Sequence, residues 1–117
     1  MSNPSTKYLH KRLPHWLKIR LPGTRKFFQL KFLIKESGLN TVCQSASCPN
    51  IGTCWDAGTL TFMILGDTCT RACRFCDVPT GHLKLPDPEE PDKVALSLSR
   101  LDLKVAVMTS VDRDDLQ

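Results

Sequence analysis

Hydrophobic residues follow a helical spacing in the first third of the chain. Between Lys26 and Lys35 they fall at Phe27, Leu30 and Ile34, three and four residues apart. This i, i+3, i+7 stripe is typical of one face of an amphipathic helix. We therefore predict a short helix here, which ends near Gly38, a residue type that commonly follows a helix.

The pattern changes in the second half. Thr59–Leu65 and Lys104–Thr109 are short runs with apolar residues on both faces, as in strands that are buried in a parallel sheet. Between them, Glu89–Leu101 has acids at its start and an apolar face, which predicts a helix. A strand, a helix and a strand in succession predict a βαβ unit with a right-handed crossover. The fold class is therefore α/β.

Two other stretches predict loops. Residues 41–58 are rich in Cys, Ser, Pro, Asn and Gly, and residues 66–88 contain three prolines. Such residues favour turns over regular elements. We expect residues 41–58 not to hold a shape unaided, and residues 66–88 to form a long loop that holds the second cysteine set.

Composition and charge narrow the class of protein. The chain has 117 residues, enough for one small domain, and its 41% hydrophobic content is ordinary for a globular protein. No apolar run approaches the roughly 20 residues of a membrane helix. Residues 1–35 hold nine Lys or Arg and no acid. This basic segment could be a transit peptide, a patch for a polyanion, or an arm that docks on an acidic partner. The aromatic residues and prolines within it favour a packed arm.

The cysteines carry the chemistry. Six cysteines in 117 residues would suggest disulfides in a secreted protein, but residues 1–30 lack the apolar core of a signal peptide. In a reducing compartment, clustered cysteines usually bind metal or take part in redox reactions.

One cysteine set has the spacing C-x3-C-x2-C and comprises Cys69, Cys73 and Cys76. A structural zinc site and a ferredoxin cluster would both need a fourth ligand. Three thiolates leave one iron of a [4Fe–4S] cluster open for a chelating small molecule. The set also follows a predicted strand, which is where barrel enzymes place their reactive groups.

With Phe75 before its last cysteine, this set resembles the radical S-adenosylmethionine signature. The resemblance implies that the open iron binds S-adenosylmethionine, whose reductive cleavage gives a 5′-deoxyadenosyl radical. It also implies that Phe75 lies near the adenine.

The other set, Cys43, Cys48 and Cys54, has the spacing C-x4-C-x5-C. Alone it could hold a cluster or a zinc ion, or its cysteines could simply be buried. Upstream of C-x3-C-x2-C, however, it resembles the auxiliary cluster site of the lipoyl synthase family. The similarity extends over roughly residues 14–117 and includes the stretches CPNIG, TFMILGDTCT, CRFCDV and TSVDRDDL.

The resemblance implies a function. A lipoyl synthase inserts two sulfur atoms, at C6 and C8, into an octanoyl group carried on a lysine, and consumes two S-adenosylmethionine molecules. Its cofactors would be two [4Fe–4S] clusters and S-adenosylmethionine, and the auxiliary cluster would donate the sulfur. Its partners would be an octanoylated lipoyl carrier domain or glycine cleavage H protein, and an electron donor such as ferredoxin or flavodoxin, with no nucleic acid and no membrane. The expected location is the bacterial cytoplasm, or alternatively a mitochondrion or plastid.

The same resemblance divides the chain. We expect residues 1–58 to form the basic arm and the auxiliary-cluster loop, and residues 59–117 to begin a TIM-type radical S-adenosylmethionine barrel. Such a barrel needs about 200 residues or more. We therefore expect a truncated chain that is inactive by itself and lacks the serine that supplies the auxiliary cluster's fourth ligand in the family.

Two other classes of function fit the residues. The cysteines could serve a metal-binding or electron-transfer module, or a zinc-stabilised nucleic-acid binder could use the basic segment. The colour of the reconstituted protein, its response to S-adenosylmethionine and the salt dependence of any nucleic-acid binding would separate these classes.

Several polar residues near the cysteines have open roles. Arg71 and Arg74 could favour thiolates or bind carboxylates, or could be solvated. Asp67 and Thr68 could hydrogen-bond around the cluster loop or simply form a turn. His82 is expected to be an ordinary loop residue. Two acids follow the second predicted strand, Asp112 and Asp114. They could contact substrate or cofactor, or they could lie in a solvated acidic loop.

Overall fold

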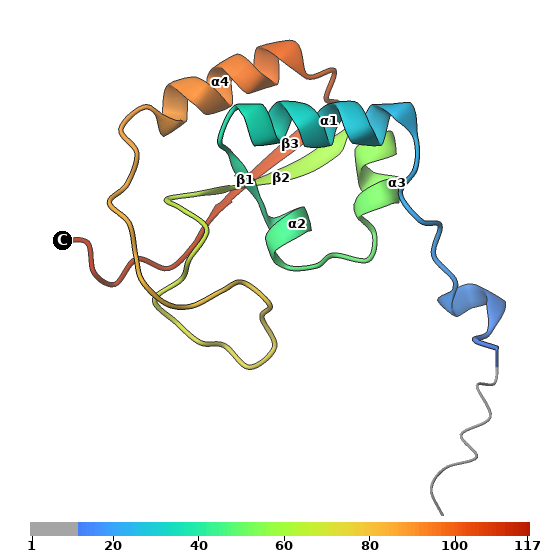
Figure 1. The fold of residues 1–117 in the computed structure, drawn as a ribbon, viewed down its shortest axis with the longest axis horizontal. Coiled ribbons are helices and arrows are strands. Elements are labelled where there is room, and N and C mark those ends of the chain that lie inside the picture. Colours follow the sequence, from blue (N-terminus) through green and yellow to red (C-terminus); the bar gives the residue numbers. More distant parts are fainter. Residues whose placement is uncertain (1–11) are drawn as a thin grey trace, which may run out of the picture.

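The computed structural model describes residues 12–117, which form a small α/β unit with a three-stranded mixed sheet (Figure 1). Its elements are, in chain order, η1 (His15–Leu17), α1 (Arg25–Glu36), β1 (Asn40–Thr41), α2 (Val42–Ser45), α3 (Ile51–Asp56), β2 (Thr59–Ile64), α4 (Glu90–Arg100) and β3 (Val105–Ser110). None of the described helices is long and apolar enough to cross a membrane.

Helix α1 confirms the predicted amphipathic stripe. The Oγ1 atom of Thr24 accepts a hydrogen bond from the Phe27 amide at 3.1 Å and so caps the first turn. The stripe residues Phe27, Leu30 and Ile34 are all buried. Gly38 follows the helix with a φ of 65°, a left-handed conformation that glycine adopts without strain.

The sheet has the order β1-β2-β3. Strands β2 and β3 are parallel, from Thr59 opposite Val105 to Ile64 opposite Ser110, and α4 connects them. The predicted strand–helix–strand arrangement is therefore confirmed. Strand β1, which was not predicted, pairs antiparallel with β2 through Thr41 opposite Phe62. A two-residue strand has no periodicity that a sequence pattern could reveal.

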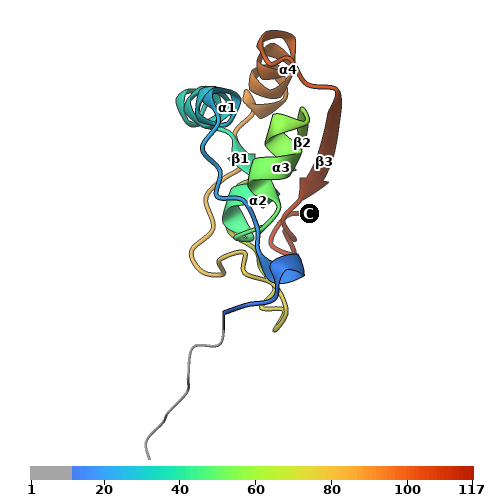
Figure 2. The same cartoon turned by 90° about the vertical axis from the view of Figure 1, so that its right-hand side faces the viewer.

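One hydrophobic core joins the elements. Helices α1, α3 and α4 lie together against one side of β2 (Figures 1 and 2). Trp55 of α3 and Leu60 of β2 are completely buried, and the Phe27 and Trp55 rings lie 5.1 Å apart. Helices α1 and α4 also meet through a hydrogen bond of 3.2 Å from the Ser97 hydroxyl to the Ser37 hydroxyl. Because the core takes side chains from both sides of Gly58, the cysteine-rich region and the sheet fold against each other.

The prediction that residues 41–58 form a loop is wrong for ten of them, which lie in α2 and α3. Thr41 caps α2, since its Oγ1 accepts a hydrogen bond from the Gln44 amide at 3.2 Å and donates one to Gln44 Oε1 at 3.1 Å. Thr-x-x-Gln is the sequence pattern of a capping box, a helix-start signal, although here Gln44 bonds the Thr41 hydroxyl and not the Thr41 amide. Helix α3 is held by burial of Trp55.

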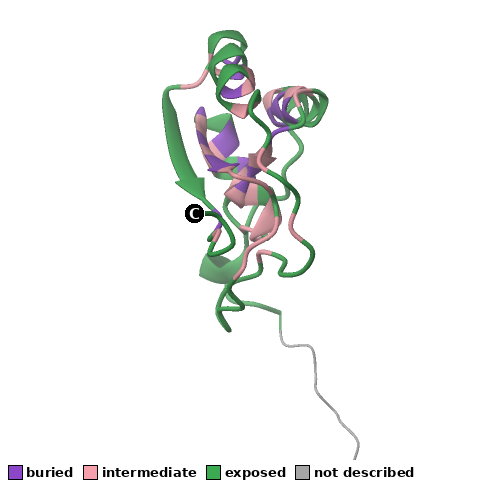
Figure 3. Ribbon diagram, turned by 90° about the vertical axis from the view of Figure 1, so that its left-hand side faces the viewer, coloured by how far each residue is buried: buried purple, intermediate pink, exposed green. Residues whose placement is uncertain are grey.

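The prediction of a buried second strand is also wrong. Every residue of β3 is exposed, with Val105 at 51%, Val107 at 45% and Met108 at 60% (Figure 3). Strand β3 is hydrogen-bonded along one edge only, to β2, and no described element pairs with its other edge. The apolar residues of β3 therefore favour a strand, but no described element packs over their side chains.

The large apolar side chains of residues 12–21 do not pack against the rest of the described chain, so the basic arm that docks on a partner stays a prediction; residues 1–11 lie outside the described part of the chain. Trp16 is 71% exposed and Leu21 is 90% exposed. Pro22 does pack against the rest of the chain. A Cβ added to Gly52 of α3 would lie only 3.2 Å from Pro22.

Candidate functional site

The first cysteine segment, residues 43–54, is built on α2 and α3. Cys43 lies in α2, Cys54 lies in α3, and Cys48 lies in the turn between them. Cys43 and Cys54 are half-buried and pack against the hydrophobic core. The Cys48 amide donates a hydrogen bond of 3.1 Å to the Cys43 carbonyl, which closes the turn. Packed side chains of the core thus support Cys43 and Cys54, two of the three cysteines of this segment.

The second cysteine segment, residues 69–76, lies in the long loop that follows β2. The chain leaves β2 through Leu65, whose φ of 69° is unusual for a residue other than glycine. The Leu65 amide donates a hydrogen bond of 2.9 Å to Glu90 Oε2 at the start of α4. Within the loop, the Cys69 amide bonds the Pro79 carbonyl at 2.9 Å and the Cys76 amide bonds the Cys73 carbonyl at 3.1 Å. Cys69 is half-buried, whereas Cys73 and Cys76 are exposed.

The residues after β3 hold this segment. The Asp112 carbonyl accepts a hydrogen bond from the Thr70 amide at 3.0 Å. The Asp112 amide in turn donates to the sulfur of Cys69 at 3.2 Å. These contacts join the carboxyl ends of two parallel strands, the edge where the loops of α/β proteins gather. Cys69 is therefore tied to the sheet through main-chain groups.

An ion pair reinforces this junction. The Arg71 guanidinium bonds both carboxylate oxygens of Asp114, at 3.1 Å and 3.0 Å, in the fork geometry typical of arginine. The hydrogen bond from Arg71, followed by the one from Thr70, lowers the pKa of Asp114 to about 2. The Asp114 hydrogen bond and charge raise the pKa of Arg71, as does the nearby Cys73 to a smaller extent. Of the open roles, Arg71 thus binds a carboxylate, and Asp114 anchors the loop.

Arg113 connects three parts of the chain. Its side chain is only 5% exposed and forms a two-point contact with Asp115 at 2.9 Å and 2.8 Å. The same guanidinium donates to the Leu65 carbonyl at 2.8 Å and the Lys84 carbonyl at 2.9 Å. It therefore joins the end of β2, the far side of the long loop and the residues after β3. No periodic pattern of residues indicates this role.

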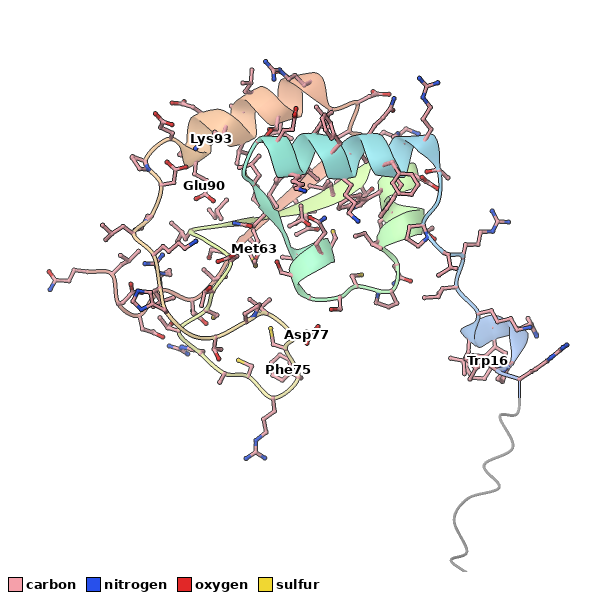
Figure 4. The ribbon with its side chains drawn as sticks, viewed as in Figure 1. Trp16, Met63, Phe75, Asp77, Glu90 and Lys93 are labelled. Carbon is pink, nitrogen blue, oxygen red and sulfur yellow. The ribbon has the colours of Figure 1, made fainter. Side chains whose placement is uncertain are left out.

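The two cysteine segments touch each other. The Ser47 hydroxyl, one residue before Cys48, donates a hydrogen bond of 2.5 Å to Oδ2 of Asp77, one residue after Cys76. Figure 4 shows Asp77 on the side of the long loop that faces α2. Neither Ser47 nor Asp77 was among the site residues expected from the sequence, because a contact across 30 residues leaves no local pattern.

The sulfur atoms themselves are not gathered. All six cysteines are free thiols, and within residues 12–117 no three Cys, His, Asp or Glu side chains come together as a metal site. Phe75 is 94% exposed (Figure 4). His82 is exposed. Asp67 accepts a hydrogen bond of 3.0 Å from its neighbour Thr68, as in a simple turn.

The donor set fits iron–sulfur clusters by its chemistry. Thiolates are the ligands that such clusters require, and each segment offers three of them within a short stretch. The surroundings also provide donors for sulfur, such as the Asp112 amide at Cys69. Beside Cys54, the buried Nε1 atom of Trp55 has no hydrogen-bond partner among the described residues. The residues that would hold the clusters are thus present on two adjoining segments.

A cavity of about 240 Å³ lies beside the second segment, at the carboxyl end of β2. Its charged lining consists of Asp67, Lys84, Asp87, Glu90 and Arg113, and no cysteine lines it. Two of these residues are already used in hydrogen bonds: Glu90 accepts from the Leu65 amide, and Arg113 donates to the Lys84 carbonyl. The cavity is therefore lined by residues that hold the long loop in place.

Comparison with known proteins gives one consistent result. No protein-family model matches the chain. It is 53% identical over 106 residues to the lipoyl synthase of Nitrosospira multiformis, 54% identical over 104 residues to that of Flavobacterium johnsoniae, and 58% identical over 104 residues to that of Methanocella arvoryzae. These alignments cover 91%, 89% and 88% of this chain and 34%, 36% and 35% of the relatives. The chain therefore spans about a third of the length of the curated relatives it matches.

Proposed function

This chain is homologous to a segment of the lipoyl synthases, and we propose that it is the part of such an enzyme that holds both iron–sulfur clusters. The observation that carries the proposal is the pair of cysteine sets. Two sets with different spacings lie on adjoining segments, joined by the Ser47–Asp77 hydrogen bond. A closed structural zinc site would want a fourth ligand beside each set of three cysteines, and a single three-cysteine cluster would use only one of the two sets.

Cys69, Cys73 and Cys76 would hold a [4Fe–4S] cluster with one open iron, and Phe75 would lie beside the adenine of bound S-adenosylmethionine. When bound, the reduced cluster and S-adenosylmethionine together supply a 5′-deoxyadenosyl radical, which can remove hydrogen from unactivated C–H bonds. The exposure of Phe75, Cys73 and Cys76 leaves this part of the loop open to ligands. The Asp112 amide would stabilise negative charge on the sulfur of Cys69, and hydrogen bonds of this kind tune cluster potentials.

Cys43, Cys48 and Cys54 would hold the auxiliary [4Fe–4S] cluster. This cluster is a substrate, since it supplies the two sulfur atoms that become attached at C6 and C8 of the octanoyl group. The core behind Cys43 and Cys54 would keep the sulfur source in a fixed place. Such placement matters because sulfur must be close to the carbon from which hydrogen has been removed.

The β2–α4–β3 unit would be the first βαβ unit of a TIM-type barrel, with residues 59–117 as its start and residues 1–58 as the arm and auxiliary site. Two observations support this assignment. The cysteine loop leaves the carboxyl end of β2, the face on which such barrels carry their reactive groups. One edge of β3 is also unpaired among the described residues, and its apolar side chains are exposed, as expected of a strand that a further strand and helices would pair with and cover.

The proposed function implies macromolecular partners. The substrate would be an octanoylated lipoyl carrier domain or glycine cleavage H protein, and the electrons would come from a carrier such as ferredoxin or flavodoxin. The enzyme would act in the cytoplasm of a bacterium, or alternatively in a mitochondrion or plastid.

The test is a turnover assay on the full-length protein that contains these residues. The protein is reconstituted without oxygen and supplied with reductant, S-adenosylmethionine and an octanoylated carrier peptide, and lipoyl peptide is measured by mass spectrometry. We expect a brown protein that forms lipoyl product. A colourless zinc protein, or cleavage of S-adenosylmethionine without any sulfur insertion, would contradict the proposal.

A matched assay uses residues 1–117 alone. The two cysteine sets should let these residues collect iron. They should give no lipoyl product, because β3 is uncovered and a parallel sheet needs both faces covered. Catalytic product from this chain would mean that the βαβ unit needs no further barrel strands.

A further inference from the structure

The contact between the two cysteine segments depends on Ser47 and Asp77. Each residue adjoins a cysteine of its own segment, Ser47 next to Cys48 and Asp77 next to Cys76. The hydroxyl–carboxylate distance of 2.5 Å is at the short end for such hydrogen bonds, which are strengthened by the carboxylate charge. Among the described residues, Asp77 has no ion pair and no other side-chain hydrogen bond.

The main chain at Ser47 makes this contact specific. Ser47 has a φ of 51°, in the left-handed region that favours glycine, directly after α2. Its amide donates to the Gln44 carbonyl at 3.2 Å, and the next amide closes the turn to Cys43. Glycine would adopt this turn with less strain, so the turn itself does not require a serine. The hydroxyl is what serine adds, and it is directed to the other segment.

We propose that the Ser47–Asp77 hydrogen bond is a positioning contact that sets the separation of the two cysteine sets. The proposal rests on the proposed function, because a fixed separation matters only if a group held by one segment acts together with a group held by the other. Cys43 and Cys54 pack on the core, whereas Cys73 and Cys76 are exposed, so the bond joins the exposed end of the second segment to the turn between α2 and α3. Ser47 and Asp77 touch neither substrate nor cofactor in this role.

The first experiment uses the metal-free full-length protein and hydrogen exchange. Ser47→Gly removes the hydroxyl and relieves the backbone strain, and Asp77→Ala removes the acceptor. In both variants the amides of residues 69–80 should exchange about tenfold faster, since loss of a tertiary contact promotes local opening. The double variant should be no faster than either single variant, because both remove the same bond. Asp77→Asn keeps an acceptor oxygen and should retain most of the protection.

Ser45→Ala is the matched control, because Ser45 lies in α2 but its side chain forms no hydrogen bond among the described residues. It should exchange as the unaltered protein does. Equal exchange in Ser47→Gly, Asp77→Ala and the unaltered protein would overturn the proposal. So would additive effects in the double variant, since these would show that the two residues act separately.

The second experiment uses the reconstituted enzyme and measures two products. Ser47→Gly and Asp77→Ala should bind iron as before and still cleave S-adenosylmethionine, but the amount cleaved per lipoyl group should rise about tenfold, because misplacing reacting groups by about 1 Å can cost 100-fold. An unchanged ratio would overturn the positioning role. If the unaltered enzyme forms no lipoyl product, the proposed function fails instead, and hydrogen exchange still decides whether the contact exists.

Discussion

The two cysteine segments offer the same donors on different supports. In the first segment, Cys43 and Cys54 sit on short helices against a core that includes the fully buried Trp55. In the second, Cys73 and Cys76 are exposed on a loop that is held by hydrogen bonds and ion pairs. Apolar packing contains no charge that can titrate or be screened, whereas exposed ion pairs are weak and easily screened by salt.

This difference suits the two proposed roles. A sulfur source has to stay in one place, while a segment that binds a small molecule at an open iron has to admit and release it. Regions with few buried apolar contacts open locally at low cost. The structure thus separates a support of packed apolar side chains from one of exposed hydrogen bonds and ion pairs.

Removing the thiols should have the largest effect. In the full-length protein, Cys69→Ala, Cys73→Ala and Cys76→Ala together should abolish S-adenosylmethionine cleavage, yet leave about half the iron, because each cluster has its own cysteines. Replacing Cys43, Cys48 and Cys54 in the same way should abolish lipoyl product and spare the cleavage. Iron analysis and product assays measure both. Loss of all iron from either triple variant would show that the two sites are interdependent.

Next in size is the core behind the first segment. Trp55→Ala should destabilise α3 by about 3–5 kcal/mol, the usual cost of truncating a buried aromatic residue. Hydrogen exchange of the α3 amides in the metal-free full-length protein measures this loss. The control is Trp16→Ala, which removes a side chain that is 71% exposed and should change stability by no more than about 0.5 kcal/mol. Similar effects from both variants would erase the distinction between the two supports.

A smaller, local effect is expected at the second segment. Arg113→Gln removes the group that joins Leu65, Lys84 and Asp115. The amides near residues 83–85 and 112–116 should then exchange about tenfold faster, while those of α2 and α3 should not change, because the loop opens separately from the core. Arg74→Gln is the control, since Arg74 is exposed and its side chain forms no hydrogen bond or ion pair among the described residues. Faster exchange in α3 would mean that the long loop supports the core as well.

The smallest effect concerns pH. Because the folded-state pKa of Asp114 is about 2, below its ordinary value near 3.9, the Arg71 pair stabilises the loop above about pH 4 and is lost as the pH falls through about 2. NMR titration of the Asp114 carboxyl carbon in metal-free protein should give this low value. In Arg71→Gln the pKa should rise toward the ordinary value. A titration unaffected by Arg71→Gln would assign the shift to Thr70 instead.

Part of this structure could be predicted from local patterns. The apolar stripe at Phe27, Leu30 and Ile34 defines α1 because only a helix brings these residues to one face. The two apolar runs identified β2 and β3, and their parallel pairing follows from the helix between them. The capping box at Thr41 and Gln44 was also available as a signal, although the many small and polar residues around it favoured a loop.

Sequence by itself determined the chemistry of this protein: the number of thiols, their two spacings and the resemblance these carry, since metal ligands are set by residue type and short-range spacing. Tertiary structure alone decided how the thiols are supported. It left β3 uncovered, placed Cys43 and Cys54 against the core, and joined Ser47 to Asp77. Burial and long-range hydrogen bonds depend on which surfaces meet after the chain has folded, and residues 30 positions apart carry no local pattern that records their meeting.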